Sequence, residues 1–89
     1  MSSINIWQVR VPKRVAKIIK CFPKREISRI QEALRGFEVD PWTGDISKIK
    51  GEENKWRRRI GNYRLLYSVR AEIKVIEIMH IERRVSSTY

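Results

Sequence analysis

The sequence is poor in the residue types that build metal centres, disulfides and membrane spans. It contains one cysteine and one histidine among its 89 residues, which argues against a Cys/His zinc site and rules out an internal disulfide. No segment approaches the roughly 18 consecutive apolar residues of a membrane-spanning helix, and the N-terminus lacks the basic and apolar runs of a signal peptide. We therefore expect a cytoplasmic protein with no metal, no cofactor and no membrane partner.

Acidic residues are also scarce relative to basic ones. Ten Asp and Glu residues face twenty Lys and Arg residues, which gives a net charge of +10. The excess is densest over residues 55–89, where nine basic residues face three acidic ones. A surface this basic concentrates polyanions, so a nucleic-acid partner is favoured over a merely solvated surface. No Gly-rich phosphate loop occurs, so phosphate contacts would come from Lys and Arg side chains.

Apolar periodicity and turn signals predict an α+β fold with the element order β-α-α-β-β-β. The length suits a single domain, residues 1–89. One small, antiparallel-rich sheet is expected to carry an N-terminal helical hairpin on one face, which leaves its other face uncovered. Gly36 is expected to stop the second helix, and Gly61-Asn62 is a two-residue hairpin turn. The predicted elements are a strand at 3–10, the helical hairpin at 12–36, an ordered connection at 38–54, and strands at 55–60, 63–70 and 73–81.

The alternation of side chains in the predicted hairpin assigns its charges to one face. The residues expected to face the helices are Trp56, Ile60, Leu65, Tyr67 and Val69. The residues expected on the uncovered face are Lys55, Arg57, Arg59 and Arg64. Arg58 breaks the pattern, and we interpret it as a residue at a sheet edge or next to a bulge, where leucine would be tolerated. Arginine is well suited to phosphate because its planar fork donates two parallel hydrogen bonds.

The segment KIKGEENKWRRRIGNYRLLYSV, followed by a strand and IERRVSSTY, resembles the RelE/ParE toxin superfamily of toxin–antitoxin systems. The shared pattern is an LKG-like turn, a WRxRxGxYRxxY hairpin, a strand, and a C-terminal RR followed by tyrosine. The resemblance extends over nearly the whole chain. It implies an intracellular toxin that a small cognate antitoxin holds inactive, in a toxin–antitoxin hetero-oligomer.

The resemblance to the RelE branch implies a metal-independent endoribonuclease that cuts mRNA on the ribosome. Arg64 and Arg57 would then hold the phosphate oxygens, and Arg83 would lie near the leaving 5′-oxygen. Tyr89 or Lys55 would accept the proton of the attacking 2′-hydroxyl, and the choice between them stays open. The predicted catalytic residues are Arg64, Arg83, Arg57, Lys55 and Tyr89. The further residues predicted to contact RNA are Arg59, Lys50, Lys48 and Arg84.

Two other functions stay open at this point. The ParE branch of the superfamily poisons DNA gyrase without nuclease activity. A plain RNA-binding module is the other alternative, with Trp56 and Tyr63 stacking on bases. We favour the nuclease because basic residues spread over several elements suit phosphate chemistry. The lone His80 is interpreted as a packed or partly exposed strand residue rather than a catalytic one.

Overall fold

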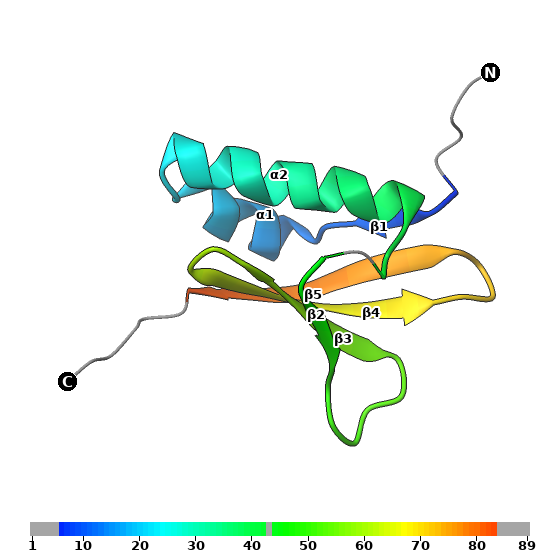
Figure 1. The fold of residues 1–89 in the computed structure, drawn as a ribbon. Coiled ribbons are helices and arrows are strands. Elements are labelled where there is room, and N and C mark those ends of the chain that lie inside the picture. Colours follow the sequence, from blue (N-terminus) through cyan, green and yellow to red (C-terminus); the bar gives the residue numbers. More distant parts are fainter. Residues whose placement is uncertain (1–5, 43, 84–89) are drawn as a thin grey trace.

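The structure, a computed structural model, describes residues 6–42 and 44–83. Two helices lie on one face of a five-stranded sheet, and the connection between β2 and β3 extends away from the helices (Figure 1). The predicted α+β class and the single sheet are therefore confirmed. The elements are β1 (Gln8–Arg10), α1 (Lys13–Lys20), α2 (Lys24–Val39), β2 (Ile46–Lys48), β3 (Lys55–Ile60), β4 (Tyr63–Arg70) and β5 (Val75–Arg83).

The sheet has the strand order β1-β5-β4-β3-β2 and is mostly antiparallel. Among the described strands, the one parallel pair joins β1 to β5, which are the first and the last strand along the chain. The β3–β4 hairpin has the predicted bounds, and Gly61 adopts the positive φ of 59° that its tight turn needs. β2 was expected to be part of a connection, but it forms an edge strand that pairs with β3.

The helices follow the predicted hairpin with one clear difference in length. Pro12 and Pro23 immediately precede α1 and α2. Gly36 was expected to end the second helix, but α2 continues through it to Val39. The extension brings Phe37 fully into the core, and this burial outweighs the weak helix propensity of one glycine, which is about 1 kcal/mol.

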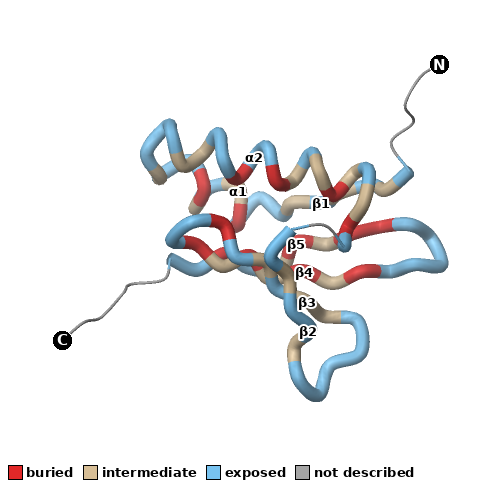
Figure 2. The backbone as a smooth tube through the Cα atoms, viewed as in Figure 1, coloured by how far each residue is buried: buried red, intermediate tan, exposed pale blue. Residues whose placement is uncertain are grey.

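The core lies between the helices and the covered face of the sheet (Figure 2). Val15, Ile30 and Phe37 from the helices are fully buried. They pack in one cluster with strand residues that include Tyr67 and Ile78. The opposite face of β3 and β4 carries exposed or half-buried side chains. The predicted division between a packed face and an open face is therefore confirmed for the hairpin.

Arg58 lies on the helix side of the sheet, as alternation requires. It was expected to lie at a sheet edge or next to a bulge, and it lies at neither. β3 is an internal strand, and its pairing with β4 contains no bulge. The Arg58 guanidinium lies over the Phe37 ring, with its Cζ 5.7 Å from the ring centroid. Gly44 covers the same guanidinium, since a Cβ at that position would lie 2.5 Å from Cζ. Arg58 is therefore a half-buried residue that packs on the core rather than a snorkelling edge residue.

The two outermost predicted strands differ from the structure at their ends. The N-terminal strand was expected at 3–10, whereas β1 covers only Gln8–Arg10, and residues 3–5 lie outside the described residues. The last strand was expected at 73–81, whereas β5 is Val75–Arg83. Neither α1 nor α2 has the length and apolar composition that crossing a bilayer requires.

Candidate phosphate-binding site

A hollow on the open face of the sheet brings together three of the predicted arginines. It has a volume of about 240 Å³ and is lined by Asp45, Ser47, Arg57, Arg59 and Arg64. These residues come from β3, β4, β2 and the position just before β2. The volume is below the about 300–1,000 Å³ typical of small-molecule sites, so the hollow suits a compact anionic group. We call this hollow the arginine pocket.

Arg59 and Arg64 oppose each other directly in the β3–β4 register. Like charges in this position destabilise a sheet, and a carboxylate lies beside each of them. Arg59 Nε donates a hydrogen bond to Asp45 Oδ2 at 3.0 Å, and Arg64 Nη1 lies 3.9 Å from Glu82 Oε1. Glu82 also opposes Arg64 in the β4–β5 register. The two carboxylates offset the repulsion between the two guanidinium groups.

Arg57 is held differently from the other two arginines of the pocket. Its Nε donates a hydrogen bond to Ser47 Oγ at 3.2 Å, and the two residues oppose each other in the β2–β3 register. Within the described part of the chain, no carboxylate forms an ion pair with Arg57. Its positive charge is therefore the least compensated of the three, which favours it as the strongest anion ligand of the pocket.

Lys55 lies on the same face as Arg57, two positions earlier in β3. Its Nζ is 3.3 Å from Glu52 Oε1, and it does not line the arginine pocket. Lys48 opposes Trp56 in the register, so it projects toward the other side of the sheet. Lys50 is exposed in the connection between β2 and β3, which projects away from the helices (Figure 1).

The structure places Arg83 apart from the arginine pocket. Arg83 opposes Tyr63 in the β4–β5 register, and Tyr63 is buried on the helix side, 3% exposed. Directly opposed residues project to the same side of a sheet, so Arg83 is on the helix side at the end of β5. Tyr89 and Arg84 lie outside the described residues.

Several residues of the site are not identified by the sequence patterns. Asp45 and Ser47 reach the arginine pocket only because β2 pairs with β3. Glu82 and His80 lie on the open face of β5, with His80 Nε2 4.0 Å from Glu82 Oε2. The only signal for Asp45 was its place beside a turn glycine, which carries no information about the partner strand.

The structure weakens the plain RNA-binding alternative. The Tyr63 ring stacks on Phe22, with ring centroids 4.4 Å apart, and is buried. Trp56 packs against the core and lies edge-on to Trp42, 5.1 Å between ring centroids. Tyr63 is therefore unable to stack on a base. Among the described residues, no group of three or more His, Cys, Asp or Glu side chains is placed to hold a metal ion.

Comparisons with known proteins match the chain over almost its whole length. The family model described as ParE toxin of type II toxin–antitoxin system, parDE, matches residues 6–86. A curated protein of Methanocaldococcus jannaschii named as a RelE1 toxin is 31% identical over 81 residues, which cover 88% of this chain and 90% of that protein.

Solved structures give the same result. The archaeal RelE–RelB complex from Pyrococcus horikoshii contains a chain that is 30% identical, with a TM-score of 0.82, and the match covers 92% of this chain and 99% of that chain. The isolated E. coli RelE toxin is 17% identical with a TM-score of 0.76, covering 91% and 87%, and it supports the fold alone.

These matches define the class of this protein as a toxin of type II toxin–antitoxin systems. Within that class, the chain belongs to the RelE/ParE toxin family, and it is RelE-like. The arginine pocket therefore lies on the open face of a toxin fold.

Proposed function

We propose that this RelE-like toxin is an endoribonuclease that cleaves mRNA on the ribosome, with the arginine pocket as its catalytic centre. The supporting observation is that three guanidinium groups line a hollow that contains a single carboxylate. Guanidinium forks complement the oxygens of a phosphoryl group. Held in place, they stabilise the extra negative charge of a pentavalent phosphorane, which is electrostatic catalysis by the chain's own cations without a metal.

The proposed reaction is an in-line transesterification of the RNA backbone. The 2′-oxygen attacks the adjacent phosphorus, and the new O2′–P bond forms as the P–O5′ bond breaks. The products are a 2′,3′-cyclic phosphate and a 5′-hydroxyl. Arg57 and Arg64 hold the non-bridging oxygens, and Lys55 or Tyr89 accepts the proton of the 2′-hydroxyl. The 5′-oxygen takes up a proton from water, because Arg83 lies on the helix side of the sheet, away from the arginine pocket. A ribosome that holds the mRNA in line offsets a weak set of acid and base groups.

A small antitoxin, encoded beside the toxin, is the proposed protein partner. Support comes from the match to a chain of a RelE–RelB complex and from the net charge of +10, which suits a partner with acidic residues. A partner that binds only the folded toxin must raise its stability. Co-expression with the neighbouring gene should therefore yield a co-purifying complex that melts at a higher temperature than the free toxin. If no protein co-purifies and the melting temperature is unchanged, this partner is rejected.

Inhibition of DNA gyrase is the second candidate function, because the matching family model is described by ParE toxins. The two candidates make opposite predictions in one experiment. Purified protein should cut mRNA inside codons on programmed ribosomes, seen by primer extension, and should leave gyrase-catalysed supercoiling unchanged. Intact mRNA together with blocked supercoiling would replace the nuclease by the gyrase inhibitor.

A further inference from the structure

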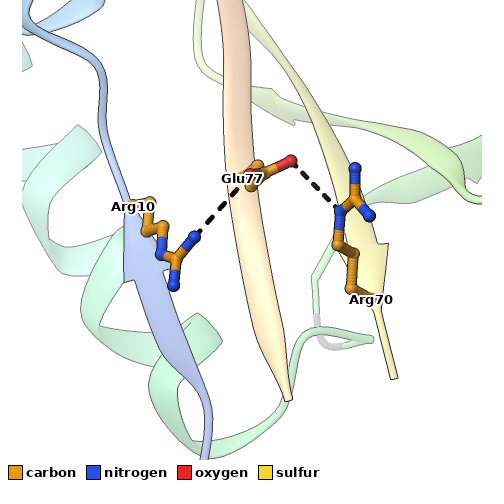
Figure 3. Close-up of polar contacts among 3 residues, drawn as sticks. All are labelled: Arg10, Arg70 and Glu77. Carbon is orange, nitrogen blue, oxygen red and sulfur yellow. Dashed lines mark hydrogen bonds and ion pairs between the residues drawn. The ribbon is translucent and has the colours of Figure 1, made fainter. Parts of the chain in front are cut away.

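A second cluster of cations lies on the open face, at the far end of β4 from the arginine pocket. Figure 3 shows Glu77 of β5 between Arg10 of β1 and Arg70 of β4. We propose that Arg10 and Arg70 bind a backbone phosphate of the RNA, several nucleotides away from the phosphate in the arginine pocket. This inference rests on the proposed RNA substrate and adds a second contact to it.

The carboxylate of Glu77 marks a position where one anionic group contacts both arginines. Arg70 Nε donates a hydrogen bond to Glu77 Oε1 at 3.3 Å, and Arg10 Nη1 lies 4.0 Å from Glu77 Oε2. The three side chains are 58%, 54% and 38% exposed for Arg70, Arg10 and Glu77. Exposed ion pairs stabilise a folded protein only weakly, so the Glu77 side chain can turn away from the arginines at small cost and leave their donors to a phosphate.

The spacing of the two sites suits an extended single strand. Arg64 of the arginine pocket and Arg70 lie at the two ends of the open face of β4. Their separation of six residues corresponds to about 20 Å along a strand. That length spans several nucleotides, in keeping with the about 4–16 nucleotides that one small single-strand-binding domain covers. Leu66 and Ser68, which lie between the two arginines on this face, add no charge.

A groove beside the second site provides room for the rest of a nucleotide. Its volume is about 470 Å³, and Arg10, Arg14 and Glu77 line it together with apolar residues. Arg14 is fixed there, because its Nη2 donates a hydrogen bond to the Met79 carbonyl oxygen at 2.8 Å. The apolar lining comes from Val11, Pro12, Ile78 and Met79. An apolar surface next to two arginines can take the face of a base while its phosphate lies on Arg10.

The proposal is tested by the binding of labelled RNA of two lengths, followed by fluorescence anisotropy. A 3-mer reaches only one site, whereas a 12-mer reaches both. The variant Arg10→Gln/Arg70→Gln should bind the 12-mer about tenfold more weakly and the 3-mer as the parent does. Its salt dependence for the 12-mer should fall by about 0.7 in log–log slope, the value for one lost phosphate contact to single-stranded RNA.

Two further variants separate phosphate binding from general charge and from structure. Lys24→Gln/Arg25→Gln removes two exposed cations from the start of α2 and should change 12-mer affinity far less. Glu77→Gln breaks the ion pairs but keeps both cations, so it should bind the 12-mer at least as tightly as the parent. An equal loss in the α2 variant, or a loss in Glu77→Gln that matches the arginine variant, would overturn the proposal.

The remaining outcomes identify which hypothesis fails. If Arg64→Ala binds the 3-mer as the parent does, the proposed role of the arginine pocket fails. This conclusion holds for any result with the Arg10→Gln/Arg70→Gln variant. If the pocket variant loses binding but Arg10→Gln/Arg70→Gln binds both RNAs normally, the second site fails alone. If Arg10→Gln/Arg70→Gln keeps RNA binding but no longer binds the antitoxin, Arg10 and Arg70 contact a protein. That result would reject the phosphate site.

Discussion

Two basic regions of this molecule differ in how their charges are held. In the arginine pocket, each of the three arginines contacts a hydroxyl or carboxylate oxygen, at distances between 3.0 and 3.9 Å. On α1, Lys13, Lys17 and Lys20 are exposed and point to solvent. No ion pair involves these three lysines within residues 6–42 and 44–83.

This difference suggests two roles: the lysines attract RNA to the protein, and the arginines act in the cleavage step. Exposed lysines on flexible stems raise the local concentration of an anion but do not fix where it sits. Guanidinium groups that contact neighbouring side chains are restricted in where they point, and directed donors are what transition-state stabilisation requires. We therefore expect substitutions in the arginine pocket to lower the rate of RNA cleavage, and substitutions on α1 to weaken binding alone.

The largest expected effect is that of Arg64→Ala. Removing one fixed donor from a centre that stabilises negative charge typically costs about 10²–10³ in rate, or about 2.7–4 kcal/mol. Growth arrest on induced expression should therefore be lost, while Lys17→Ala should remain toxic. Arg64 is on the open face with its side chain 34% exposed, so the variant should melt close to the parent. A fully toxic Arg64→Ala, or one that melts far below the parent, would show that Arg64 is structural.

A smaller effect should separate geometry from charge. Arg57→Lys keeps the positive charge but loses the guanidinium fork that donates to Ser47 and, in the proposed mechanism, to a phosphate oxygen. We expect cleavage to slow by about tenfold, which corresponds to about 1.4 kcal/mol. The matched exchange Lys17→Arg on α1 should change nothing. If Arg57→Lys and the parent cleave mRNA equally fast in a ribosome assay, activity depends on the positive charge at position 57 and not on the guanidinium geometry.

Arg58→Leu tests the packed arginine on the other side of the same strand. The sequence pattern suggested that leucine would be tolerated there, but Arg58 lies over Phe37 and under Gly44. Loss of this half-buried cation–π contact should cost about 1 kcal/mol of stability, visible in a thermal melt. RNA binding should be unchanged, because the side chain lies away from the open face. If Arg58→Leu is as stable as the parent, leucine is tolerated at this position, as the sequence pattern suggested.

The smallest effect concerns the buried Tyr67. Burial raises the pKa of Tyr67 to about 12, and the nearby positive charge of Arg58 opposes this increase. The unfolded tyrosine ionises near pH 10, so the folded state binds the proton more tightly and stability falls as pH rises from about 10 to 12. Tyr67→Phe removes this loss but also removes the hydrogen bond to the Pro41 carbonyl oxygen. Its stability deficit in denaturant melts should therefore narrow above pH 10, and a constant deficit would contradict the raised pKa.

The β3–β4 hairpin could be predicted residue by residue, whereas β2 could not. The hairpin has clear alternation and a two-residue turn that sets its register. β2 is three residues long, which is too short to show a period. Asp45 and Ser47 of the arginine pocket could not be found for the same reason, because their contacts depend on the pairing of β2 with β3.

A bulge in β5 decides which face of the sheet Arg83 lies on, and side-chain alternation in the sequence does not reveal this bulge. The β4–β5 register shifts between Leu66 and Tyr67, which leaves Met79 as the extra residue in β5. A bulge reverses the faces of the residues that follow it. His80 and Glu82 therefore reach the open face, and Arg83 is on the helix side with Ile81. The catalytic role of Arg83 stays a prediction from the resemblance.

The contrast between fixed arginines and exposed lysines is tested most directly by single-turnover cleavage on programmed ribosomes at increasing ribosome concentration. The comparison uses Arg64→Ala and the triple variant Lys13→Gln/Lys17→Gln/Lys20→Gln. We predict that Arg64→Ala lowers the maximal rate by about 10²–10³, and that no ribosome concentration restores it. The triple variant should reach the parent's maximal rate at a higher ribosome concentration. A maximal rate that is unchanged in Arg64→Ala, or lowered equally in the triple variant, would contradict the account.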